Sequence, residues 1–148
     1  MPKQPFTKEE FDAIFSRVPR LNVELIIMTS EGLLLTKRTI EPGKGQWHFP
    51  GGTVRFGEKL TEAVKRVAKD ELGLKVEARN PIGFIEYPYA FKKGYKGWPV
   101  GIAFETHILG GELRRDDQSE EVGYFLDVPK NTMKDQALFL REFVFKNP

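Results

Sequence analysis

The 148-residue sequence contains no cysteine, and this absence excludes several kinds of chemistry. A disulfide framework, a thiol nucleophile and a zinc site built from thiolates all require cysteine. The sequence also lacks an apolar run long enough to span a membrane, and its amino terminus lacks the apolar core of a signal peptide. We therefore expect a cytoplasmic protein that does not associate with membranes.

A strong charge of one sign is lacking as well. The 23 basic and 21 acidic residues are interspersed and give a net charge of +2. This balance is too mild to predict a nucleic-acid partner. The sequence shows no internal repeat, low-complexity tract or convincing linker, and its length suits one hydrophobic core. We expect a single domain that covers residues 1–148.

The hydrophobic periodicity predicts a mixture of strands and helices. The motif Thr7 to Glu10 is a capping box that would open a helix running to about residue 17. Extended segments are expected at 22–29, 32–38, 47–56 around a Pro-Gly-Gly turn, 75–91 with a break at Asn80-Pro81, 100–109 and 122–128. Further helices are expected at 58–72 and 131–145, and a hairpin loop at 92–98. This pattern predicts an α/β fold with a mixed sheet flanked by helices.

The segment 52–74, GTVRFGEKLTEAVKRVAKDELGL, is the most informative part of the sequence. It leads from a glycine-rich turn into an amphipathic helix that Gly73 would end as a left-handed cap. At about 100° per residue, Glu71 falls within the apolar stripe of this helix and Asp70 on its margin. A carboxylate on a buried face costs free energy unless a cation accompanies it, and hard divalent cations prefer oxygen ligands. The pattern favours a metal site; the alternative is an ordinary amphipathic helix with a charged end.

At these positions the chain resembles the Nudix hydrolases. Their box reads glycine, five residues, glutamate, seven residues, then REUXEEXGU, where U is bulky and aliphatic. In this chain the last part reads RVAKDELGL, which matches at Glu71, Gly73 and Leu74 and departs at Val67, Ala68 and Asp70. The resemblance implies an α/β/α sandwich with a mixed sheet, and a Mg²⁺ cofactor that Mn²⁺ can replace.

Segments outside the box resemble the GDP-mannose mannosyl hydrolases, from about residue 11 to residue 126. The matching positions include Lys37-Arg38-Thr39, Pro42, Gly45, Trp47, Pro50-Gly51-Gly52 and Asp117-Gln118. This resemblance implies that the Gly51 carbonyl, Glu71 and Gln118 hold the metal, with Asp70 as a ligand or as a hydrogen-bond acceptor behind the ligands. It also implies that Arg38 neutralises the leaving diphosphate, that Arg66 orients the box carboxylates and that Glu58 ties the glycine-rich loop to the helix.

Two departures from these families remove the usual proton acceptors. The mannosyl hydrolases place a histidine directly after the metal-binding glutamine, where this chain has Ser119. Ordinary Nudix pyrophosphohydrolases often use the box glutamate that is Val67 here. A serine hydroxyl does not accept protons near neutral pH, so Glu120 and Glu121 become the candidates; the alternative is that both are solvated loop charges. His48 is interpreted as a strand side chain rather than a base.

The basic and aromatic loop KKGYKGW at 92–98 is a candidate for substrate binding. Tyr95 or Trp98 would stack on a nucleobase and Lys96 would hold phosphate, unless the loop is simply a solvated hairpin. Glu24, the one acid of an apolar strand, would contact the base or the sugar, or would be an exposed strand acid.

Three functions follow from these residues. The first is a Mg²⁺-dependent hydrolase of nucleoside diphosphate sugars that releases the nucleoside diphosphate and the sugar. The second is an ordinary pyrophosphohydrolase that attacks phosphorus in a nucleotide. The third is a Nudix-like module that binds a nucleotide with little or no catalysis. In each case the partner is a small nucleotide or nucleotide sugar, and a homodimer is left open.

Overall fold

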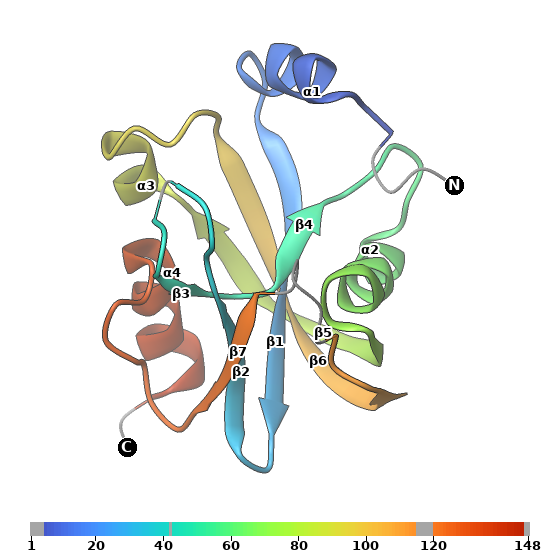
Figure 1. The fold of residues 1–148 in the computed structure, drawn as a ribbon, viewed down its shortest axis with the longest axis vertical. Helices are drawn as coiled ribbons and strands as arrows, with labels where there is room; N and C mark the ends of the chain where they lie inside the picture. The colour runs from blue at the N-terminus through green and yellow to red at the C-terminus, as the bar shows by residue number, and fades with distance from the viewer. Residues whose placement is uncertain (1–4, 42, 115–119, 147–148) are drawn as a thin grey trace.

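The computed structural model describes residues 5–41, 43–114 and 120–146. These residues form a seven-stranded mixed sheet whose centre is the parallel pair β1 and β6 (Figure 1). The main path through the sheet is β3-β2-β1-β6-β5, while β4 pairs with β1 and β7 pairs with β2. Every pairing except that of β1 with β6 is antiparallel. The strands are β1 (Arg20–Thr29), β2 (Gly32–Lys37), β3 (Trp47–His48), β4 (Gly51–Thr53), β5 (Leu74–Glu86), β6 (Pro99–Gly111) and β7 (Glu121–Phe125).

Helices cover the sheet on both sides. Helix α2 (Leu60–Val67) continues into a wider π-helical turn, η1 (Ala68–Leu72), and both lie on one side of the sheet (Figure 1). Helix α4 (Lys134–Phe139) and its π-helical continuation η2 (Leu140–Val144) lie on the other side, together with the short α3 (Pro88–Lys92). Helix α1 (Lys8–Phe15) packs beside the start of β1. The predicted α/β/α arrangement is therefore confirmed.

The alternation of side chains along β1 builds one core on each side of the sheet. Val23, Leu25 and Ile27 are fully buried in a cluster with α2, whereas Ile26 belongs to a second cluster with α4 and η2. This follows from the two-residue period of a strand, which sends neighbouring side chains to opposite faces. Glu24 has the same parity as Ile26, so the sequence places its carboxylate on the α4 side.

Several predicted elements are confirmed. Thr7 Oγ1 accepts a hydrogen bond from the Glu10 amide at 3.1 Å, and Glu10 Oε1 accepts one from the Thr7 amide at 2.9 Å, which completes the capping box. The helix that it opens ends at Phe15. The second helix begins at Leu60 rather than at 58, and Gly73 caps it in the left-handed conformation with φ 74°.

Other predicted boundaries were wrong. The extended segment 75–91 ends at Glu86, because α3 begins at Pro88 and the carboxylate of Asp135 accepts hydrogen bonds from the Tyr89 and Ala90 amides at its first turn. The expected break at Asn80-Pro81 is instead a shift of register within β5. Strand β7 ends at residue 125, not at 128.

The expected burial of Glu71 was also wrong. The apolar stripe of α2 continues through Val67, Ala68 and Leu72, all of which are buried, while Glu71 remains exposed. The helix widens into a π-helical turn at these residues, so the regular 100° wheel no longer describes which side chains face the core.

No helix in the described parts of the chain combines the length and apolarity needed to cross a membrane.

Candidate active site

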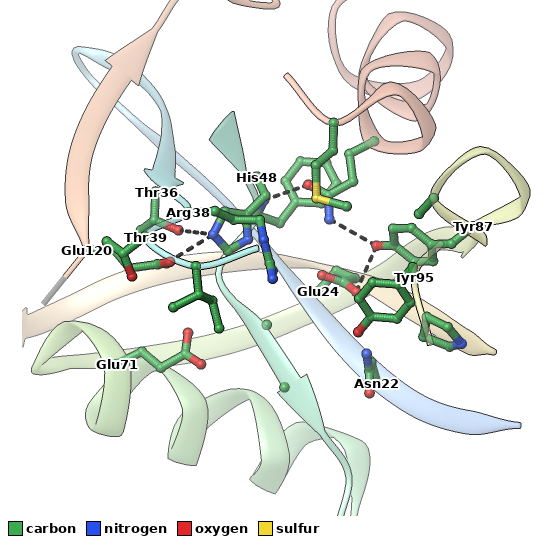
Figure 2. Close-up of a pocket in the computed structure, with 18 of the residues that line it drawn as sticks. Asn22, Glu24, Thr36, Arg38, Thr39, His48, Glu71, Tyr87, Tyr95 and Glu120 are labelled. Carbon is green, nitrogen blue, oxygen red and sulfur yellow. Dashed lines mark hydrogen bonds and ion pairs between the residues drawn. The ribbon is translucent and has the colours of Figure 1, made fainter. Parts of the chain in front are cut away.

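A cavity of about 430 Å³ opens beside β1 and β4, between η1 and the α3–α4 side of the molecule (Figure 2). Its two ends differ in chemistry. At one end lie Arg38, His48, Glu71 and Glu120; at the other lie Asn22, Glu24, Tyr87 and Tyr95. The residues drawn from η1, β1, β2, β3 and α3 are distant in sequence, so the fold and not a local motif makes this cavity.

Acidic groups are crowded at the first end. Glu71 and Asp70 from η1 line the cavity together with Glu120, which precedes β7. Although Glu71 is open to the cavity, the surrounding wall removes much of its water, and this desolvation with repulsion from Glu120 and Asp70 raises the pKa of Glu71 to about 7. A hydrogen bond with the Gly51 backbone and the charge of Arg66 act in the opposite direction.

The donors present suit a hard divalent cation in kind, because carboxylate and carbonyl oxygens are its preferred ligands. A bound cation would also offset the repulsion between the crowded carboxylates. Within the residues that the structure describes, however, no group of three His, Cys, Asp or Glu side chains is close enough to hold a metal. The ligand set expected from sequence adds the carbonyl of Gly51, a residue of the cavity wall, and Gln118. Gln118 and Ser119 lie outside the described residues.

His48 and Glu120 form a hydrogen-bonded pair in the cavity wall. His48 Nε2 lies 3.0 Å from Glu120 Oε1 and 3.2 Å from Thr36 Oγ1 (Figure 2). Burial alone would raise the pKa of Glu120, but hydrogen bonds from His48 and Thr36 and the positive charge of Arg38 together hold that pKa below its usual value. An ionised carboxylate only accepts hydrogen bonds. Nε2 of His48 is therefore protonated and is the donor of the hydrogen bond to Glu120.

Glu24 closes the other end of the cavity as part of a buried chain of hydrogen bonds. Tyr87 Oη donates to Glu24 Oε1 at 3.0 Å, and Gln136 Nε2 donates to Tyr87 Oη at 2.9 Å. Gln136 Oε1 accepts from the Phe49 amide at 2.7 Å. Glu24 is 5% exposed, so the alternative of an exposed strand acid was wrong.

Glycine makes the space that Glu24 occupies. A Cβ atom on Gly51 would lie 2.6 Å from Glu24 Oε2, and one on Gly101 would lie 2.6 Å from Glu24 Oε1. Both distances are too short for non-bonded atoms, so any larger residue on β4 or β6 at these points would displace the carboxylate.

We expect the stability of the metal-free protein to decrease with rising pH because of Glu24. The pKa of Glu24 is raised to about 8, mainly by burial. Repulsion from Glu71 acts in the same direction, and the hydrogen bond from Tyr87 acts against it. At pH values between the pKa in the unfolded state, near 4.3, and the pKa in the folded state, the folded state binds more protons. The free energy of unfolding therefore falls as pH rises, by at most about 1.4 kcal/mol per pH unit. Urea denaturation in EDTA from about pH 5 to about pH 8 should show a shallower slope for Glu24→Gln than for the wild type. Equal slopes would contradict an unusually basic Glu24.

The structure brings Tyr95 to the cavity but not Trp98. The Tyr95 hydroxyl accepts a hydrogen bond from Arg20, whose guanidinium also lies 5.3 Å from the ring centroid of Phe11. Trp98 is 40% exposed and packs edge-on against Phe91, with ring centroids 5.2 Å apart, outside the cavity lining.

Glu121 is likewise kept out of the cavity. Its Oε2 lies 3.4 Å from Lys37 Nζ, on the neighbouring strand β2, and both side chains are exposed. Glu120 belongs to the cavity lining, whereas Glu121, held by Lys37, does not. Of the two predicted proton acceptors, the geometry therefore leaves Glu120.

Glu58 ties the glycine-rich loop to the helix as expected, and its partner on the helix is Arg66. Arg66 donates from Nε to Glu58 Oε2 at 2.7 Å and from Nη2 to Glu58 Oε1 at 3.0 Å, and Glu58 Oε1 also accepts from the Arg55 amide. A further bond from Arg66 Nη2 to the Thr53 carbonyl, 2.9 Å long, fastens the loop to α2. Val67 is 2% exposed and packs toward Gly52, so this position belongs to the core.

Sequence reasoning missed several residues of the cavity wall: Arg20, Asn22, Thr36, Tyr87, Arg114 and Gln136. It also interpreted His48 as a strand side chain, which is true of its backbone but omits its contact with Glu120. The available signal was the position of His48 three residues before Gly51. Its partner Glu120 lies 72 residues away, and no local pattern links the two.

Comparisons with known proteins find relatives of this chain both in sequence and in fold. The model of the Nudix domain matches residues 18–145. The low-salt glycan biosynthesis protein Agl8 of Haloferax volcanii is 41% identical over 124 residues, which cover 79% of this chain and 77% of the relative. An ADP-ribose pyrophosphatase of Methanocaldococcus jannaschii is 35% identical over 107 residues, which cover 72% of this chain and 62% of the relative. A MutT Nudix hydrolase from Burkholderia pseudomallei superposes with a TM-score of 0.73 at 27% identity, covering 86% of this chain and 98% of that one.

Proposed function

This chain belongs to the Nudix family of hydrolases, and on that premise we propose that it hydrolyses nucleoside diphosphate sugars with a divalent cation. Nudix hydrolases act on nucleotide derivatives and generally use divalent metal ions. The substrate of this chain would resemble GDP-mannose, and the products would be the nucleoside diphosphate and the sugar. The proposed metal is Mg²⁺, with Mn²⁺ as a substitute.

The observation that carries the proposal is the position of Glu120. It lies in the cavity that Glu71 and Arg38 also line, while Val67, at the position of a usual box base, is buried in the core. A proton acceptor that comes from the segment before β7, rather than from the box helix, resembles the arrangement implied for the mannosyl hydrolases. The relative named for glycan biosynthesis also supports a substrate that carries a sugar.

In the proposed reaction the residues of the cavity, with Gln118, have separate roles. Glu71, Asp70, the Gly51 carbonyl and Gln118 would hold the cation, which when bound neutralises the diphosphate and activates water. The guanidinium of Arg38 stabilises the charge that develops on the leaving diphosphate. Glu120 accepts the proton of the attacking water, and Tyr95 and Glu24 contact the base or the sugar at the far end.

A second candidate is hydrolysis at phosphorus. The 35% identical relative named as an ADP-ribose pyrophosphatase favours it, because a pyrophosphatase cleaves between phosphates. In this case the products would be a nucleoside monophosphate and a sugar phosphate. A third candidate, binding without turnover, rests on the absence of both usual bases, since Ser119 and Val67 occupy their positions.

Product analysis separates these candidates. The protein would be incubated with a panel of nucleotides and nucleotide sugars in Mg²⁺, and the products identified by chromatography and mass spectrometry. We expect a nucleotide sugar to give the nucleoside diphosphate and the unphosphorylated sugar, and EDTA to stop the reaction. A monophosphate with a sugar phosphate would favour the pyrophosphohydrolase. Tight binding of one nucleotide without any turnover would favour the binding module.

A further inference from the structure

The sheet brings His48 and Glu120 together from the ends of two different strands. His48 lies directly opposite Thr36 in the pairing of β3 with β2. On the other edge of β2, Val122 lies opposite Thr36, and Glu120 precedes the paired residue Glu121. Strand β2 thus carries β3 and β7 on either side of Thr36, and the side chains of His48 and Glu120 meet over it (Figure 2).

From this arrangement we infer that His48 is a positioning residue, which with Thr36 fixes the Glu120 carboxylate in the orientation that accepts the proton of the attacking water. The inference rests on the proposed function and assigns to His48 a role in that reaction. The contact is only partly open to solvent, because the side chain of His48 is 14% exposed and that of Glu120 is 29% exposed.

The need for such a residue follows from the place of Glu120 in the chain. It lies just before β7 and outside its hydrogen-bonded ladder, so the strand does not fix its side chain. A glutamate side chain has several rotamers, and restricting it to one of them costs conformational entropy. The hydrogen bond of 3.0 Å from His48 Nε2, together with Thr36, offsets that cost before substrate arrives.

The reaction that this positioning serves balances as follows. The oxygen of water forms a bond with the anomeric carbon of the sugar, and the bond between that carbon and the diphosphate oxygen breaks. The electron pair of the broken bond leaves with the diphosphate, beside Arg38. The proton of the water passes to Glu120, which keeps its hydrogen bond from His48 throughout. His48 itself does not touch the reacting atoms, so its effect should fall on turnover and not on substrate binding.

The chain supplies a matched control. It contains two histidines, and the other, His107, has a similar contact with Glu105 at 3.2 Å on the exposed surface of β6, away from the cavity. We expect His48→Ala to lower kcat about 10- to 100-fold with KM changed less than about twofold, as for a misplaced catalytic group. His107→Ala should match the wild type. His48→Gln, whose amide can donate to Glu120, should recover part of the lost kcat.

A double-mutant cycle tests whether the effect passes through Glu120. In a Glu120→Gln background, adding His48→Ala should cause little further loss, because the carboxylate to be positioned is already gone. Without substrate or metal, the ¹⁵N signals of the two histidines report the contact directly: Glu120→Gln should shift the Nε2 resonance of His48 and leave that of His107 in place.

Each outcome decides the inference. An unchanged kcat in His48→Ala, additive losses in the cycle, or an unmoved His48 resonance would overturn it, even if the wild type hydrolyses nucleotide sugars as proposed. If His48→Ala is too unstable to assay, His48→Gln replaces it in the same experiments. A His48→Gln protein that is folded but inactive, and whose loss is additive with that of Glu120→Gln, also contradicts the inference. A wild-type protein that turns over no nucleotide sugar overturns the proposed function and this inference together.

Discussion

Replacing Glu71 by glutamine should abolish most activity while the protein remains folded. The substitution keeps the size of the side chain but removes a charge from a cavity wall that is crowded with acids. A neutral amide is a poorer ligand for a hard divalent cation than a carboxylate. We expect kcat/KM to fall at least about 100-fold, which is more than the loss typical for a residue that only hydrogen-bonds to a metal ligand. The affinity for Mn²⁺ should also weaken. Steady-state kinetics across a Mg²⁺ titration and Mn²⁺ binding by electron paramagnetic resonance would measure both.

Glu121→Gln is the matched control for this experiment. It removes the same charge from a glutamate that pairs with Lys37 outside the cavity. Circular dichroism should show that both variants are folded, because Glu71 is open to the cavity and not part of the core. Wild-type turnover and wild-type metal affinity in Glu71→Gln would remove Glu71 from the metal site.

Replacing Arg38 by lysine should lower kcat although the positive charge is kept. A guanidinium presents a planar fork that can hold two oxygens of a diphosphate at once, whereas an ammonium acts as a point charge. Arg38 belongs to the cavity wall, where its charge also acts on Glu120. In the proposed function the leaving diphosphate develops its charge at this part of the wall. We expect a fall in kcat of about 10- to 100-fold, measured at saturating substrate and Mg²⁺.

Arg79→Lys serves as the control for Arg38, because Arg79 is an exposed arginine that pairs with Glu77 at 3.5 Å on β5. It should leave the kinetics unchanged. If Arg38→Lys did the same, Arg38 would have a structural role in the cavity wall, and the proposed stabilisation of the diphosphate would have to come from another cation.

The parts of the fold that the sequence predicted are those specified by neighbouring residues. The capping box of Thr7 and Glu10, the amphipathic stripe of α2 and the left-handed cap at Gly73 all depend on contacts within a few residues. Helix α3 was missed because its first turn is capped by Asp135, which lies more than forty residues away. The Nudix family was predicted from the box spacing, and the domain match confirms it.

The same distinction applies to the cavity. The box motif predicted Glu71 and Asp70, and the flanking resemblance predicted Arg38 and Gly51; all four line one cavity. Glu24, for which the sequence left two interpretations open, lines the same cavity. The sequence could not choose between Tyr95 and Trp98, or between Glu120 and Glu121, because the path of the backbone decides which of two nearby loop residues faces the cavity. Glu121 pairs with Lys37 outside the cavity, which leaves Glu120, and the registers of β2 with β3 and β7 bring His48 beside it.

The central claim is that water attacks the sugar carbon and not phosphorus, and hydrolysis in ¹⁸O-labelled water tests it most directly. The products of a turned-over nucleotide sugar would be separated and weighed by mass spectrometry after a short incubation, with a control for exchange of label into the unphosphorylated sugar. The account predicts that the label enters the sugar and that the nucleoside diphosphate remains unlabelled. Label in a phosphate-containing product would contradict it and assign the reaction to attack at phosphorus.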